Sequence, residues 1–72
     1  MYFPRLEELR LRANKTQAEI ACMLGCKREV YRRYEKGLHD LPVWALLELA
    51  RYYGVSTDYI LGLSDRPIPR SR

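Results

Sequence analysis

The sequence predicts an all-α domain of five short helices, and two patterns in its 72 residues carry this prediction. Apolar residues recur three and four positions apart through most of the chain, a spacing that places them on one face of a helix. Each apolar segment is followed by glycine or asparagine, which adopt the left-handed conformation at which many helices end. A chain of this length forms one domain, so we expect the helices to share a single core.

The first helix is predicted from about Arg5 to Ala13, because Leu6, Leu9 and Ala13 are spaced to lie on one face. A proline just before it is compatible with a helix start, since the N–H groups of the first turn have no helical partner. Asn14 follows and can end the helix, because asparagine tolerates a positive φ.

A second helix of about two turns is predicted after Thr16. Thr16 and Glu19 fit a capping box, in which each side chain accepts a hydrogen bond from a backbone N–H at the helix start. Gly25 can end this helix, whose apolar face comprises Ile20, Ala21 and Leu24.

The third helix follows a short turn through Cys26 and ends at Gly37. Two short helices separated by three or four residues, with glycine at the turn, are typical of a helix-turn-helix unit. On this third helix we expect Val30, Tyr31 and Tyr34 to face the core.

A fourth helix is predicted from about Val43 to Tyr53, and a fifth begins after Ser56 as N-cap and runs through about Leu61. The fourth is the most apolar, so we expect it to form the centre of the core through Val43, Leu46, Leu47, Leu49, Ala50 and Tyr53. Trp44, Tyr52 and Tyr53 fit either a stacking platform for a base or cofactor or ordinary core packing. Their helical spacing favours the core.

The segment from Gly25 to Gly37 holds most of the positive charge. Its five cations and two carboxylates give three of the four net positive charges of the chain. On a helix, the charged side chains Arg28, Glu29, Arg32, Arg33 and Lys36 fall on the side opposite the apolar residues. Such a face is either solvated decoration or a contact for a polyanion. Cations at a helix start oppose the helix dipole, and a bound anion would reverse that cost.

Several classes of function are disfavoured by composition. No apolar run approaches the length of a membrane span, and no leader sequence is apparent, so we expect a cytoplasmic protein. Cys22 and Cys26, with His39 far along the chain, cannot complete a structural zinc site; we interpret both cysteines as reduced thiols, Cys26 in the core and Cys22 nearer the surface. No catalytic residues, cofactor, metal or small-molecule ligand are predicted, since no nucleophile with a base or glycine-rich phosphate loop is present.

Composition also divides the chain. Residues 1–62 are predicted to form the domain, whereas 63–72 are rich in Ser, Asp, Pro and Arg, and two prolines oppose a helix there. We expect 63–72 to be an extended, flexible C-terminal tail.

The ordered pattern of these residues resembles the XRE family of bacterial and phage helix-turn-helix regulators, the Cro and phage-repressor type. The resemblance covers roughly residues 5–62 and rests on many positions in register, including Arg5-Leu6, Leu9-Arg10, Thr16-Gln17-Ala18-Glu19-Ile20-Ala21, Leu24-Gly25, Tyr34-Glu35-Lys36-Gly37, Leu46-Leu47-Glu48-Leu49-Ala50, Tyr53-Gly54-Val55-Ser56 and Asp58-Tyr59-Ile60-Leu61-Gly62. It implies a compact, lambda-repressor-like domain whose third helix enters the DNA major groove.

The resemblance also implies roles for individual residues. Gln17 matches a phosphate contact at the start of the second helix, and Arg10 and Glu35 match an ion pair that ties the first helix to the third. Base-reading positions match Lys27, Arg28, Glu29 and Arg33, and backbone-contacting positions match Arg32 and Lys36.

Two positions depart from the family pattern. Lys27 stands where many members have a serine or threonine N-cap, so a water, a phosphate or a shifted helix start must replace that cap. Glu29 lies among the base-reading positions, where it could accept from cytosine N4, pair with Arg33 four residues on, or keep phosphates away. For the free protein we favour the pairing with Arg33.

The leading functional hypothesis is a sequence-specific, double-stranded DNA-binding transcriptional regulator, and most simply a repressor. The alternative is a protein-interaction or antitoxin-like module that uses the same helices or the 63–72 tail. Because one such unit reads few base pairs, we also expect a weak or DNA-assisted homodimer through the fifth helix, with residues such as Tyr59 and Leu63.

Overall fold

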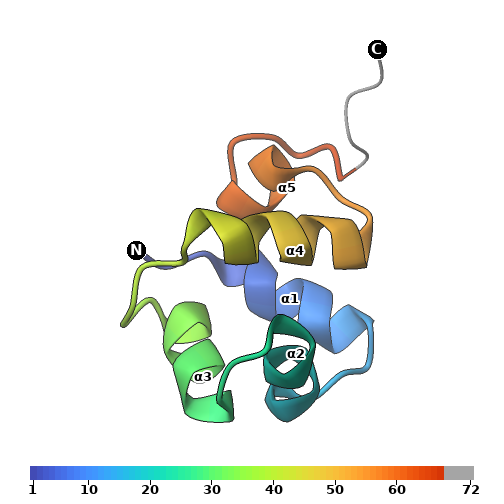
Figure 1. Cartoon of the computed structure of the whole chain (residues 1–72). Helices are drawn as coiled ribbons and strands as arrows, with labels where there is room; N and C mark the ends of the chain where they lie inside the picture. Colours follow the sequence, from blue (N-terminus) through green and yellow to red (C-terminus); the bar gives the residue numbers. More distant parts are fainter. Residues whose placement is uncertain (68–72) are drawn as a thin grey trace.

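The computed structural model describes residues 1–67, and these form five helices without a strand (Figure 1). The bounds are Pro4–Arg12 for α1, Gln17–Leu24 for α2, Arg28–Lys36 for α3, Val43–Tyr53 for α4 and Thr57–Leu61 for α5. Each agrees with the predicted range to within one residue, and α1 lies one residue nearer the N-terminus than predicted. The all-α fold class and the helix-turn-helix at α2 and α3 are therefore confirmed.

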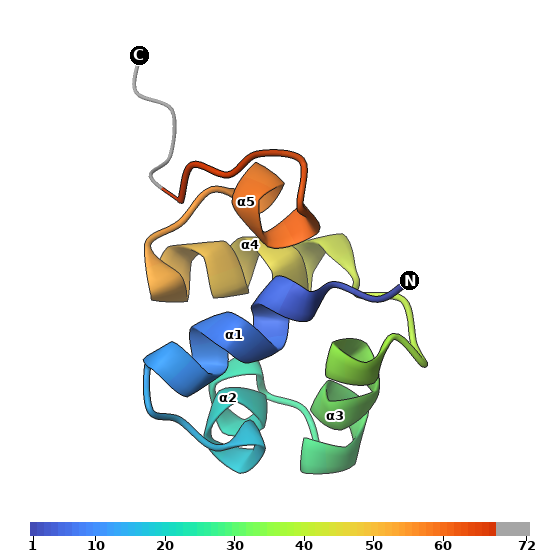
Figure 2. The ribbon, with the colours of Figure 1, turned by 180° about the vertical axis from the view of Figure 1, so that it is seen from behind.

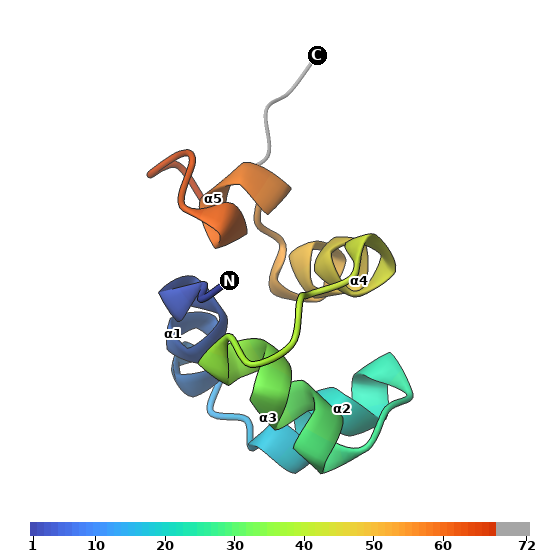
Figure 3. The same cartoon turned by 90° about the vertical axis from the view of Figure 1, so that its left-hand side faces the viewer.

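The helices form two groups around one core. In Figures 1 and 2, α2 and α3 lie together at one end of the molecule, and α4 and α5 lie at the other. In Figure 3, α4 is seen nearly end-on, across the core from α1. The largest fully buried apolar side chains come from all five helices: Leu6, Ile20, Tyr31, Leu49 and Ile60. The helix-turn-helix is thus one end of a shared core rather than a separate unit.

The predicted helix ends are formed by the expected local chemistry. Thr16 Oγ1 accepts from the backbone N–H of Glu19 at 3.1 Å, and Glu19 Oε1 accepts from the N–H of Thr16 at 2.8 Å, which completes the capping box. Asn14 has a φ of 58°, as its role in ending α1 requires. Ser56 Oγ accepts from the N–H of Tyr59 at 3.0 Å and caps α5.

The prediction for α4 was wrong on two core positions. Ala45, Leu49 and Ala50 are buried, but Val43 is 70% exposed and Leu47 is 46% exposed. Because α4 lies at the surface of so small a domain, only one side of it can be covered. The apolar pattern predicted the helix correctly but not how much of its circumference its neighbours cover.

The favoured interpretation of the aromatic residues was also partly wrong. Trp44 is 50% exposed and Tyr52 is 42% exposed, so the core encloses neither side chain. Tyr53 alone packs against the core, and its ring meets that of Tyr52 edge-on at 5.1 Å between centroids. In α1, Ala13 is exposed and does not extend the apolar face of Leu6 and Leu9.

The first part of the predicted tail contacts the domain. Arg5 donates from Nη1 to the carbonyl of Tyr59 at 2.8 Å and from Nη2 to Asp65 at 2.7 Å, and its guanidinium lies 4.2 Å from the centroid of the Tyr59 ring. The backbone N–H of Ser56 donates to the carbonyl of Pro67 at 2.9 Å. Residues 63–67 therefore pack on α1 and α5, and the rest of the predicted flexible tail, 68–72, lies outside the described residues.

Both cysteines are free thiols; Cys22 is exposed and Cys26 is partly buried against the core. Burial raises the pKa of the Cys26 thiol. Among residues 1–67, none of the helices has the length and apolarity needed to cross a membrane.

Candidate nucleic-acid interface

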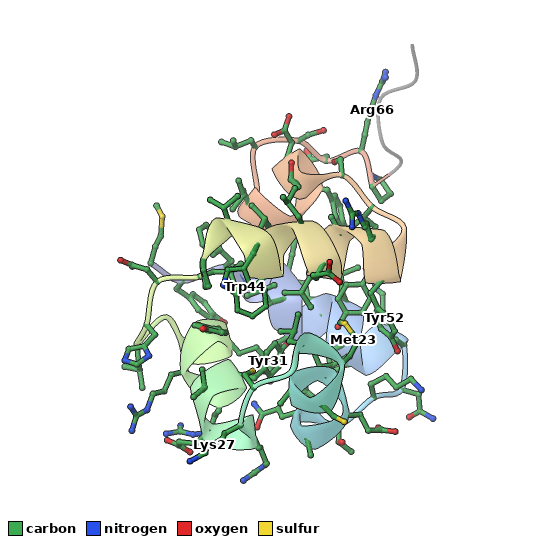
Figure 4. All side chains as sticks on the ribbon, viewed as in Figure 1. Met23, Lys27, Tyr31, Trp44, Tyr52 and Arg66 are labelled. Carbon is green, nitrogen blue, oxygen red and sulfur yellow. The ribbon has the colours of Figure 1, made fainter. Side chains whose placement is uncertain are left out.

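The exposed side of α3 carries five charged side chains that share one face of the helix. We call this the recognition face, and it comprises Arg28, Glu29, Arg32, Arg33 and Lys36. The opposite side of α3 is held in the core by Tyr31, which is fully buried, and by the partly buried Tyr34. In Figure 4, Tyr31 points between α3 and α2, and Lys27 extends from the outer end of α3. The same helix thus packs on one side and presents charge on the other.

The start of α3 has no side-chain cap. Lys27 is the N-cap residue, with φ −76° and ψ 150°, and its side chain accepts no hydrogen bond because an ammonium is only a donor. The N–H groups of the first turn of α3 are consequently left for solvent or an anion. The absence of a capping side chain at Lys27, expected from the sequence, is therefore present in the structure, and α3 does not start at another residue that could cap it.

A buried ion pair ties α3 to α1. Arg10 Nε donates to Glu35 Oε2 at 2.6 Å, and the two side chains are 10% and 1% exposed. Gln17 Nε2 donates to Glu35 Oε1 at 3.0 Å, so α2 joins the same carboxylate. Burial raises the pKa of Glu35, but the hydrogen bonds from Arg10 and Gln17 outweigh it and hold that pKa below the ordinary value. Glu35 therefore fixes α3 relative to both α1 and α2.

Two hydroxyl groups lie close to this network without a hydrogen-bond partner among the described residues. They are the buried Tyr31 and Tyr53 oxygens. Burial, followed by the nearby charge of Glu35, raises the pKa of Tyr31 and raises that of Tyr53 to about 12. Both tyrosines therefore stay neutral and act as packing residues beside the ion pair.

An open groove runs between the start of α2 and the recognition face. Its lining is rich in cations and includes Arg10, Leu11, Lys15, Thr16, Gln17, Ala18, Arg28, Arg32 and Lys36. The first N–H groups of α2 also lie here, where the helix dipole favours an anion. Gln17 is thus at the groove, although its side-chain amide donates inward to Glu35 rather than standing free. Lys15 lines the same groove, although the sequence did not predict it as a site residue. Its position directly before the capping box could have indicated a cation near the start of α2.

Glu29 contacts two arginines at once. Its carboxylate accepts from Arg32 Nε at 3.1 Å and Nη2 at 2.8 Å, and from Arg33 Nε at 3.3 Å. The favoured partner Arg33 is present, but Arg32 makes the shorter and bidentate contact. The hydrogen bonds from Arg32 lead the effects that lower the pKa of Glu29 to about 2.

The amino-acid sequence matches a family of known proteins. A family model described as a helix-turn-helix domain matches residues 5–60. The chain is 41% identical over 70 residues to the uncharacterized HTH-type transcriptional regulator YobD of Bacillus subtilis, covering 97% of this chain and 62% of that protein. It is 41% identical over 58 residues to the HTH-type transcriptional regulator ImmR of Bacillus subtilis, covering 81% of this chain and 46% of that protein.

A more distant relative is the cryptic phage CTXphi transcriptional repressor RstR of Vibrio cholerae, 31% identical over 55 residues, which are 76% of this chain and 50% of that protein. The chain thus spans only about half to three-fifths of the length of these relatives. No solved structure matches it. The segment matched by the family model runs from residue 5 to residue 60 and so reaches from α1 into α5. On this evidence the chain belongs to the helix-turn-helix family to which XRE-type transcriptional regulators and phage repressors belong.

Proposed function

We propose that this protein is a sequence-specific, double-stranded DNA-binding transcriptional regulator, and that it acts as a repressor. The observation that carries the proposal is the junction of the recognition face with the cationic groove at the start of α2. An α-helix fits the major groove, and a second helix whose first N–H groups face the phosphates fixes its register. The relatives named as HTH-type regulators and as a phage repressor support the same function.

The proposed roles follow from position. Arg28 and Arg33 are suited to guanine, because a planar guanidinium matches the O6 and N7 acceptors. Arg32, Lys36 and Gln17 border the groove and are suited to the phosphate backbone. No chemical step is involved, and we propose no cofactor. Action at DNA further implies a cytoplasmic site in a bacterial or phage-infected cell.

A homodimer on two half-sites remains part of the proposal, but its contact surface needs correction. Tyr59 is only 7% exposed and its ring is covered by Arg5, so it is not free to meet a partner. Leu63, at 75% exposed, is free to do so. Sedimentation at high micromolar concentration, with and without operator DNA, should detect the dimer; only monomers in both conditions would exclude it.

The experiment that tests the function is selection of bound duplexes from a random library at moderate salt. We expect enrichment of a short palindrome, since sequence reading by a two-fold dimer demands matched half-sites. An unenriched library would contradict sequence-specific binding and would favour the protein-interaction or antitoxin-like alternative. Affinity measured over a salt series should fall steeply, because bound cations release counterions from the phosphates.

A further inference from the structure

The charge on the recognition face is partly neutralised within the protein. Glu29, Arg32 and Arg33 form one connected group, which we call the Glu29 clamp, with three hydrogen bonds between 2.8 and 3.3 Å. All three side chains are between 37% and 50% exposed, so the group lies on the surface that would meet DNA. Glu29 therefore engages two of the four cations of the recognition face before any DNA arrives, and a third, Lys36, lies 4.0 Å from Glu7 on α1.

Binding to DNA changes what the clamp must do. Arg33 gives the carboxylate only its Nε–H and keeps both Nη groups for another partner, whereas Arg32 gives it Nε and Nη2 and has to leave it to present that pair of donors to a phosphate or a guanine. The carboxylate then remains beside the polyanion as a pure acceptor, since the low pKa of Glu29 keeps it ionised at neutral pH. A phosphate oxygen or the O6 and N7 acceptors of guanine repel it, whereas the amino groups of cytosine (N4) and adenine (N6) can donate to it. Cytosine suits it better, because adenine presents its N7 acceptor beside the N6 donor.

We propose that Glu29 is a specificity-determining residue. It weakens binding to DNA of arbitrary sequence, because its carboxylate engages Arg32 and Arg33 and adds a negative charge that is compensated most fully where cytosine N4 faces it. The inference rests on the proposed DNA-binding function, and it adds which base Glu29 favours at one position of the half-site. A purely structural role for Glu29 would have a different effect. A carboxylate in the first turn of α3 interacts favourably with the helix dipole, but this interaction stabilises the fold and does not alter which DNA sequence is bound.

The test compares the full chain with its Glu29→Gln variant. Two probes are used: a labelled duplex of arbitrary sequence, and the operator recovered from the random library by the wild-type protein. For the arbitrary duplex we expect the variant to bind about eightfold more tightly at 0.1 M salt, with a salt dependence steeper by about 0.9 in logarithmic slope, the effect of one added phosphate contact. Operator affinity should rise less, so the ratio of specific to arbitrary binding should fall.

The chain offers a matched control on another face. Glu48 pairs with Arg51 on α4 at 3.6 Å, with the same i to i+3 spacing as Glu29 and Arg32 and with a similarly exposed carboxylate. Helix α4 lies away from α3 in Figure 1, at the other side of the core. Glu48→Gln removes the same charge and should leave the specificity ratio within about twofold of wild type. Superimposable thermal melts of the two variants would show that neither effect comes from unfolding.

A second readout is the base preference itself. Selection with the wild-type protein should recover cytosine at one position of each half-site, and selection with the Glu29→Gln variant should lose that preference. An unchanged ratio and an unchanged base preference in the variant would overturn the inference while leaving DNA binding intact. An equal rise with Glu48→Gln would also overturn it, in favour of net charge alone. If the wild-type protein and both variants all failed to bind either duplex at low salt, the proposed DNA-binding function would be overturned along with the inference about Glu29.

Discussion

Glu35 is the residue that joins the recognition helix to the rest of the domain. Its carboxylate is 1% exposed and receives hydrogen bonds from Arg10 on α1 and Gln17 on α2. A charge this deeply buried is stable only while its partners remain, because the cost of removing it from water is large. The contact that fixes the orientation of α3 is therefore one in which the loss of either partner should destabilise the fold.

Substitution Glu35→Gln should lower the free energy of unfolding by about 3 kcal/mol, because it removes the buried counter-charge of the Arg10 guanidinium and leaves it only the more exposed Glu7, at 3.7 Å. Urea denaturation followed by circular dichroism measures the change. The matched control is Glu48→Gln on the exposed α4 pair, for which we expect less than about 0.5 kcal/mol. Similar losses in the two variants would contradict the importance given to the buried pair.

The same residue predicts how stability depends on pH. The pKa of Glu35 is lower in the folded protein than its ordinary value of 4.5 in the unfolded chain. Its stabilisation is thus fully present above pH 4.5 and is lost as the pH falls toward the folded-state pKa, where the carboxylate takes up a proton. Denaturation curves collected between pH 7 and pH 3 should show this decline, and the decline should be shallower in Glu35→Gln.

The division of labour on the recognition face is testable with two further substitutions. Arg33→Ala should relax discrimination at one base position by about 1 to 3 kcal/mol, because it removes a planar donor suited to guanine. Lys36→Ala should weaken binding to all sequences alike and reduce the salt slope by about 0.9. Titrations of operator and arbitrary duplexes over a salt series separate the two effects, and equal shifts on both duplexes for both variants would refute the assigned roles.

At the scale of the helix, α2 and α3 differ in how they begin. A complete capping box closes α2, whereas α3 starts at Lys27 with no side-chain acceptor. Stability alone would favour a serine there, since capping residues stabilise a helix start by about 1 kcal/mol. The uncapped, cationic start of α3 suits an anion more than it suits the isolated protein, in line with the compromise between stability and function common at binding sites.

Lys27→Ser should therefore stabilise the free protein by about 0.5 to 1 kcal/mol and weaken its binding to DNA. Chemical denaturation reports the first effect, and duplex titration reports the second. Lys15→Ser, just before α2, serves as the control, because the Thr16 cap is already in place and no gain in stability is expected. A stabilised variant with unchanged DNA affinity would show that Lys27 does not contact the duplex.

The helix ends were the part of the fold that local sequence could predict. Thr16, Asn14 and the glycines that follow the helices act within a few residues of where they stand, so their roles depend little on tertiary structure. The exposure of Val43 and Trp44 could not be predicted in this way. A helical pattern gives the faces of α4, but which face is covered depends on the placement of the other helices.

In the candidate site, too, the features set by local sequence could be predicted, and those set by tertiary structure could not. The charged side of α3 follows from its sequence, whereas the contact of Gln17 with Glu35 joins residues 18 positions apart and depends on how α2 crosses α3. The clamp at Glu29 could be predicted only in part, because both Arg32 and Arg33 lie within reach and helical spacing does not choose between them. Assignment of DNA contacts to single residues remains a prediction.

Across the whole molecule, Arg5 connects the start of α1 to the last described residues. It donates to the Tyr59 carbonyl and to Asp65, and it stacks on the Tyr59 ring. Helix α5, which these contacts reach, lies at the end of the fold farther from α3 (Figure 2). The two ends of the domain are thus held by different charged residues, Arg5 near α5 and Arg10 near α3.

Arg5→Ala should lower the free energy of unfolding by about 2 kcal/mol, because charged hydrogen bonds to partly buried carbonyls are lost. Asp65→Asn, which alters only the exposed partner, should cost less than about 0.5 kcal/mol. Hydrogen exchange gives a local measure: in Arg5→Ala the Ser56 N–H, which donates to the Pro67 carbonyl, should lose protection. Retained protection there would contradict the link between Arg5 and residues 63–67.

The clamp at Glu29 also has a kinetic consequence. A regulator finds its operator by repeated short visits to other DNA, and the time spent on each visit grows with the strength of non-specific attraction. On the proposed function, each visit to an incorrect sequence should end sooner because Glu29 holds Arg32 and Arg33, while Lys27, Arg28 and Lys36 should still steer the approach. The Glu29 carboxylate would accordingly shorten the search for the operator, although it lowers the affinity for DNA.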